Sequence, residues 1–64
     1  NMEKPVVIKA DNGMYVMAFA KYLVEFIADK YAAKVFKSKA EAYLALDEIS
    51  KATTCINFTL EEIN

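Results

Sequence analysis

An Asn-Gly pair between two apolar, β-forming runs, in VVIKADNGMYVMAF, constrains the fold of this chain more than any other feature. Asn12 and Gly13 are residues that a type I′ turn favours, because both tolerate a positive φ, and the twist of that turn suits paired strands. The segment therefore predicts a β-hairpin. A two-residue loop pairs Ala10 with Tyr15, and alternation along the strands then separates two faces. The predicted core face carries Val6, Ile8, Ala10, Tyr15, Met17 and Phe19.

The opposite face of the predicted hairpin is half apolar. It carries Val7, Lys9, Asp11, Met14, Val16 and Ala18. An antiparallel sheet with one solvated face usually shows polar residues there. We therefore expect this face to be covered as well, by the same chain or by a second copy of it.

The segment AKYLVEFIADKY fits two structures. As a strand it alternates its side chains between two faces, and as a helix it aligns a stripe that includes Phe19, Tyr22 and Phe26. Aromatic and β-branched residues dominate it and no capping residue precedes it, so a strand is favoured, with Ala20-Lys21 as the reversal. The pattern alone leaves residues 20–28 between strand and helix.

Capping residues mark two helices. Asp29 begins DKYAAKVF and predicts one or two helical turns, with Ala32, Val35 and Phe36 turned inward.

The main predicted helix begins at Ser38, which forms a capping box with Glu41. A helical period gives it an apolar face and a charged remainder. The apolar face consists of Ala42, Ala45, Leu46, Ile49 and Ala52. After the helix, the alternating segment TCINFTLEEI predicts a last strand.

These elements predict an α+β fold in one domain, residues 1–64: a small antiparallel sheet (hairpin, third strand and C-terminal strand) with one main helix packed on one face. A chain of this size buries only about 60% of the surface that it exposes when unfolded. Cys55 is the only cysteine and histidine is absent, so the sequence predicts neither an internal disulfide nor a structural zinc site. Tight packing or oligomerisation must compensate.

The residue types also bear on chemistry. Without histidine, Cys55 has no evident activating base, and the paired carboxylates are adjacent residues that point apart. Gly13 is the only glycine, too few for a phosphate-binding loop. We therefore predict that the chain is not an enzyme and has no catalytic, cofactor-binding or metal-binding residues.

Charge and hydropathy suggest where such a chain works. The net charge of −1 disfavours direct nucleic-acid binding, which depends on neutralising phosphates. No apolar run approaches the roughly 18 residues of a membrane span, and the N-terminus lacks a signal-peptide layout. A lone cysteine suits a reducing compartment, so we expect a cytoplasmic protein without membrane contact. We take Met2 as the natural start and Asn1 as an addition.

Leu44 is out of place, because the helical period puts it among the charged residues. Three interpretations stay open: a scattered surface leucine, an anchor for a protein partner, or a residue covered by a second copy. The candidate partner-binding residues around it are Tyr43, Leu44, Asp47, Glu48 and Lys51. They would form an apolar centre with an acidic rim, the usual anatomy of an interface.

The run YLVEFIADKYAAKVFKSKAEAYLAL, with NGMYV upstream, resembles small proteins of phages and mobile elements. In these proteins a hairpin with a glycine turn leads through an aspartate-containing stretch to a helix start similar to SKAEA. They include anti-CRISPR inhibitors, so the resemblance implies a protein that occupies a surface of a bacterial defence complex. The sequence thus predicts a non-enzymatic protein-binding module, with a self-associating homodimer as the alternative.

Overall fold

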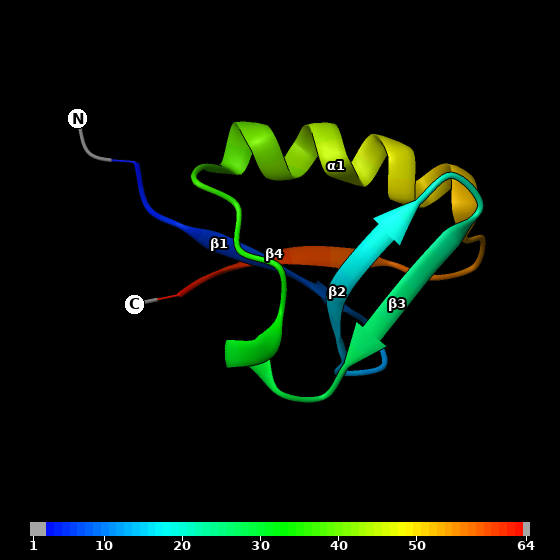
Figure 1. Cartoon of the computed structure of the whole chain (residues 1–64), viewed down its shortest axis with the longest axis horizontal. Helices are drawn as coiled ribbons and strands as arrows, with labels where there is room; N and C mark the ends of the chain where they lie inside the picture. Colours follow the sequence, from blue (N-terminus) through cyan, green and yellow to red (C-terminus); the bar gives the residue numbers. More distant parts are fainter. Residues whose placement is uncertain (1–2, 64) are drawn as a thin grey trace.

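Four antiparallel strands form one sheet, and a long helix, α1, lies across one of its faces (Figure 1). The computed structural model describes residues 3–63, so the predicted start at Met2 lies outside the described residues. The elements are β1 (Val6–Ala10), β2 (Tyr15–Ala20), β3 (Leu23–Ile27), the 3-10 helix η1 (Lys30–Ala32), α1 (Lys39–Ala52) and β4 (Phe58–Glu62). The strand order is β3-β2-β1-β4, which confirms the predicted fold class and the strand within residues 20–28.

The first hairpin is present, but its predicted register was wrong by one residue. Lys9, not Ala10, lies opposite Tyr15, and the Ala10 N–H donates to the Met14 carbonyl (2.8 Å). Only Gly13 in this loop has a positive φ, of 89°, so the connection is a three-residue loop and not a type I′ turn. The one-residue slip exchanges the two faces of β2, because side chains alternate with a period of two.

A β-bulge then restores part of the predicted pattern. The pairing of β2 with β3 shifts register between Val16 and Ala18, which leaves Met17 as the extra residue. The register slip places Val16 in the core beneath α1, and the bulge returns Phe19 to the same cluster. Tyr15 is buried as predicted, but on the opposite face of the sheet. The predicted core position of Met17 was wrong, because Met17 is exposed.

The connector between η1 and α1 inserts beside β1, where a strand partner is expected. Phe36 exchanges two backbone hydrogen bonds with Val6 (both 2.9 Å), and the Lys34 N–H donates to the Val16 carbonyl (3.0 Å). Asp29 caps η1 as predicted, since its carboxylate accepts from the Tyr31 N–H (2.9 Å). Phe36 is buried as predicted. The inward positions predicted for Ala32 and Val35 were wrong, because both are exposed and Ala33 is buried instead.

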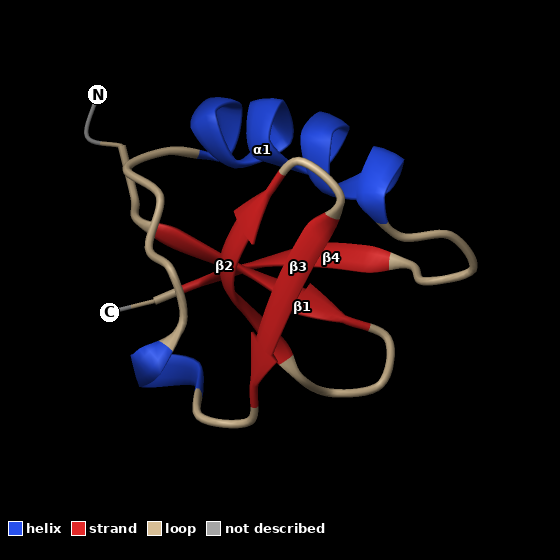
Figure 2. Cartoon of the chain, turned by 45° about the vertical axis from the view of Figure 1, so that its right-hand side comes forward, coloured by secondary structure: helices blue, strands red, loops and turns tan. Residues whose placement is uncertain are grey.

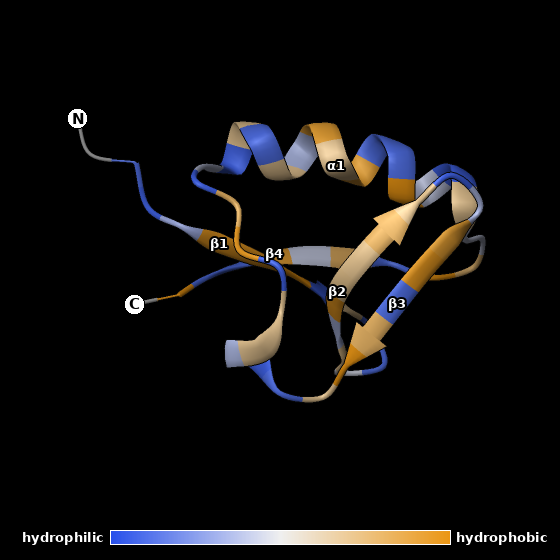
Figure 3. Cartoon of the chain, in the orientation of Figure 1, coloured by the Kyte–Doolittle hydropathy of each residue, from blue (hydrophilic) through white to orange (hydrophobic). Residues whose placement is uncertain are grey.

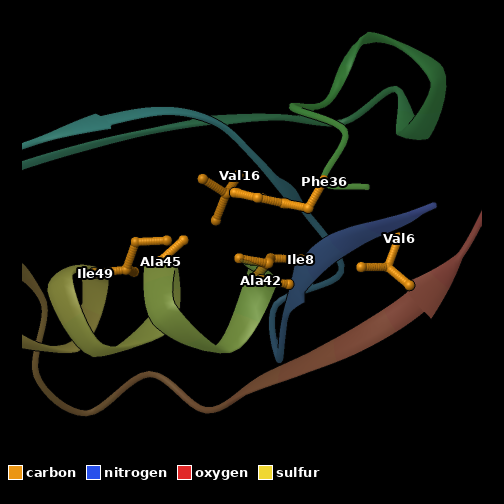
Figure 4. Packing of buried hydrophobic residues seen from close by; sticks show 7 residues of the cluster. All are labelled: Val6, Ile8, Val16, Phe36, Ala42, Ala45 and Ile49. Atoms are coloured by element: carbon orange, nitrogen blue, oxygen red, sulfur yellow. The ribbon is translucent and has the colours of Figure 1, made fainter. Parts of the chain in front are cut away.

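Helix α1 buries the predicted face. The Ser38 hydroxyl accepts a hydrogen bond from the Glu41 N–H (3.2 Å), which satisfies one of the free donors at the helix start. Ala42, Ala45 and Ile49 project from the helix toward Val16 and Phe36 (Figure 4). The small alanines allow close approach to the sheet, and the helix carries both hydrophobic and hydrophilic residues along its length (Figure 3).

The other face of the sheet is also covered in part, because η1 lies on the opposite side from α1 (Figure 2). Val7, Tyr15 and Ala33 form a second buried cluster there. The two valines that were predicted to share one half-apolar face of the hairpin therefore lie on opposite faces of the sheet. Val16 is fully buried under α1, and Val7 is fully buried on the other side. A dimer contact through Val16 is not available in this fold.

Candidate functional site

The outer face of α1, defined as Tyr43, Leu44, Asp47, Glu48 and Lys51, is solvent-exposed at all five predicted positions. Leu44 is 74% exposed and Tyr43 is 61% exposed, so two large apolar side chains lie next to each other on this face. Their exposure follows from the helix orientation, because Ala45 and Ile49 point into the core. The structure thus brings the five residues together on one rigid element.

The charges on this face are partly paired with one another. The Lys51 ammonium lies 3.5 Å from an Asp47 carboxylate oxygen and 3.6 Å from one of Glu48. All three side chains are well exposed, so these pairs contribute little to stability. The expected acidic rim is present, with two carboxylates against one ammonium.

A groove runs between α1 and β4, on one side of the outer face. It has a volume of about 320 Å³. Its lining residues are Lys39, Tyr43, Leu46, Phe58, Thr59 and Leu60. Leu46, Phe58 and Leu60 are half-buried and also pack on the main core, so they form an apolar floor. Lys39 makes no ion pair with any residue of the described range 3–63.

A second groove, of about 290 Å³, lies where the β2–β3 turn meets the end of α1. Its lining residues are Lys21, Tyr22, Glu48, Lys51 and Ala52. The turn uses Lys21-Tyr22, one residue beyond the predicted reversal, because Ala20 pairs with Leu23. Two residues of the outer face therefore border this groove as well.

Tyr22 combines backbone strain with exposure. Its φ is 70°, a conformation that costs roughly 1–2 kcal/mol for a residue with a Cβ. The side chain is 79% exposed and contacts the Lys21 ammonium, 5.2 Å from the ring centroid. Burial within the chain therefore does not explain an aromatic residue here. The positive φ follows from the two-residue turn, because Ala20 pairs with Leu23 and the second central residue of such a turn adopts a positive φ.

A polar cluster lies on the face opposite α1. The Glu61 carboxylate accepts a hydrogen bond from the Tyr15 hydroxyl (3.1 Å) and lies 2.6 Å from the Lys30 ammonium. The hydrogen bond from Lys30 holds the pKa of Glu61 below its ordinary value of 4.5, and the same bond raises the pKa of Lys30 above 10.5. This cluster ties η1 to β4 across the sheet, so its role is structural.

Cys55 is exposed in the turn before β4 and has a φ of 66°. In residues 3–63, no cluster of three or more His, Cys, Asp or Glu side chains is placed to hold a metal ion. Over the same range, no helix is long and apolar enough to cross a membrane.

The sequence predicted the outer face but missed the two grooves. The position of Tyr22 beside the end of α1 depends on how the β2–β3 hairpin twists, which no local pattern reveals. For the groove along β4, the sequence offered only the alternation of Phe58 and Leu60, which indicated a strand but not a groove. The chain matches none of the protein-family models, curated sequences or solved structures with which we compared it.

Proposed function

We propose that this chain is a non-enzymatic protein-binding module whose contact surface is the outer face of α1. The observation that carries the proposal is the exposure of Leu44 and Tyr43 on a helix whose other side is tightly packed. A fully buried leucine contributes about 1.5–3 kcal/mol relative to an exposed one, so a partner that covers Leu44 gains substantial affinity.

Two further features support the same surface. Grooves border the outer face on two sides, and such concave surfaces accept side chains of a partner. The strained, exposed Tyr22 lies at one of them, and tyrosine is enriched at protein interfaces.

The finer role that we propose is that of a phage-type inhibitor of a bacterial defence complex. This part rests on the resemblance of the sequence to anti-CRISPR-like proteins. An inhibitor of this kind acts by occupying a surface that the defence complex needs, and it requires only affinity and shape.

A phage infection assay tests both the inhibitory role and the contact surface on α1. The chain is expressed in a bacterium whose CRISPR defence targets a phage, and plaques are counted. We expect the chain to restore plaque formation and Leu44→Asp to abolish the effect. Val35→Asp is the matched control, because Val35 is exposed (51%) in the connector before α1.

Two results would overturn the proposal. Plaque counts that the chain does not change would refute the inhibitory role. A folded Leu44→Asp variant that is as active as the unmodified chain would refute the outer face of α1 as the contact surface. Circular dichroism of the purified variants verifies that both are folded.

A further inference from the structure

β4 is an edge strand that lines the groove along α1 and leaves backbone groups unpaired on its outer side. β4 pairs with β1 and with no other strand of the described residues. The Asp11 N–H donates to the Asn57 carbonyl (2.8 Å) in the register that pairs Lys9 with Thr59. Hydrogen-bonded pairs recur at every second residue of an antiparallel ladder, so Thr59 and Glu61 also point toward β1. The backbone N–H and C=O groups of the alternate residues point away from the sheet: Phe58, Leu60 and Glu62.

The same alternate residues place their side chains beside the groove. Phe58 and Leu60 pack on the helix side of the sheet and, with Leu46, form the apolar floor. A strand added at this edge would thus find main-chain hydrogen bonds and an apolar surface for every second side chain. Strand addition to a sheet edge uses these two features, the first for affinity and the second for specificity.

The charge at the groove suggests what such a strand carries. Lys39 lies in the first turn of α1 at the rim, and no acidic group of residues 3–63 pairs with it. A carboxylate from a ligand would complement this ammonium. The five residues of β4 span about 17 Å, an edge that matches the length of a short extended segment.

We propose that the groove between α1 and β4 binds an extended segment of a partner protein. The segment adds to β4 as a fifth strand, places apolar side chains on Leu46, Phe58 and Leu60, and sets a carboxylate against Lys39. This inference rests on the proposed protein-binding function and names the kind of partner segment that the chain recognises.

Selection from a display library of short random peptides, with the purified chain as bait, tests the proposal. We expect enriched peptides in which apolar residues alternate and an acidic residue holds a fixed position. With Lys39→Glu as bait, the acidic position should become basic. Peptides selected on the unmodified chain should bind Lys39→Glu at least about threefold more weakly, the effect of one exposed ion pair. Lys21→Glu, which changes the other groove, is the matched control and should leave the selection unchanged.

Amide hydrogen exchange of the complex with an enriched peptide gives a second readout. The amides of Phe58 and Leu60 should become protected when the peptide binds, whereas the Thr59 amide, already bonded to β1, should be protected without it. No enrichment, enrichment of a helical pattern, or Phe58 and Leu60 amides protected in a dimer without peptide would overturn the proposal.

These outcomes are separable from failure of the proposed function. Leu44→Asp leaves the groove lining intact, so it should bind the selected peptides as the unmodified chain does while failing in the infection assay. If Lys39→Glu no longer binds the selected peptides but still restores plaque formation fully, the groove binds a segment that is not involved in the inhibition of the defence complex.

Discussion

Replacement of Ile49 by alanine should destabilise the domain severely, because Ile49 is fully buried between α1 and the sheet. The change removes three carbons, worth about 2.4 kcal/mol in transfer free energy alone. Its helix neighbours on the buried face, Ala42 and Ala45, are too small to fill the cavity, so we expect a total loss of about 3–4 kcal/mol. A domain of this length has roughly 3–10 kcal/mol of stability, so much of it would be lost.

Leu44→Ala is the matched control for Ile49→Ala, because it removes the same number of carbons from the same helix. Leu44 is 74% exposed, and we expect its replacement to change the free energy of unfolding by no more than about 0.5 kcal/mol. The comparison therefore reports which side of α1 faces the core, independently of any partner.

Urea unfolding followed by far-UV circular dichroism measures both variants. With a urea slope of about 1 kcal/mol/M, the midpoint of Ile49→Ala should fall by about 3 M and that of Leu44→Ala should hardly move. Equal losses for the two variants, or a loss under about 1 kcal/mol for Ile49→Ala, would show that α1 is oriented differently, and the proposed contact surface would then be wrong.

Three further predictions concern other parts of the chain. Glu61→Gln should lower stability at neutral pH but not in strong acid. The pKa of Glu61 is depressed in the folded state, so its contribution is complete above its ordinary value of 4.5 and disappears as the pH falls through the folded-state value. Denaturation curves at the two pH values test this, and an equal loss at both would contradict it. Tyr22→Gly should raise stability by about 0.5–1 kcal/mol, since glycine adopts the φ of 70° without steric strain, and an unchanged or lower urea midpoint would argue against strain at the turn. Cys55 should react with a thiol reagent in native buffer as fast as in urea, because it is exposed, and a protected thiol would show that the turn before β4 is packed differently.

The main helix and its orientation could be predicted from the sequence, because the evidence for them is local. Ser38 and Glu41 mark the start of α1, and the period of the alanines and Ile49 fixes the buried side. The exposure of Leu44 follows directly from that period. Residue spacing alone was therefore enough to predict which residues form the outer face of α1.

The details of the sheet could not be predicted, because they depend on contacts between distant segments. The Asn-Gly pair indicates a hairpin, but only the structure shows that Gly13 alone takes a positive φ and shifts the register. The bulge at Met17 changes which residues of β2 face the core. Phe36 pairs with Val6 at the start of β1, on the side where a regular hairpin would continue the pairing with β2.

The curvature of the sheet has the same origin. The rings of Phe26 on one edge strand and Phe58 on the other stack with centroids 6.4 Å apart, so the sheet curls beneath α1. The groove between α1 and β4 depends on this curvature and on where α1 lies across the sheet. Neither the groove nor its neighbour at Tyr22 has a signature in local sequence.

Site-specific photo-crosslinking in a bacterium with an active CRISPR defence tests most directly whether the outer face of α1 is a contact surface. p-Benzoylphenylalanine replaces Tyr43 on the outer face or, as the control, Tyr31, which is exposed on η1 on the opposite side of the sheet. We predict a discrete adduct of higher mass, formed on irradiation, from the probe at Tyr43 and none from the probe at Tyr31. No adduct from position 43, or equal adducts from both positions, would contradict this account.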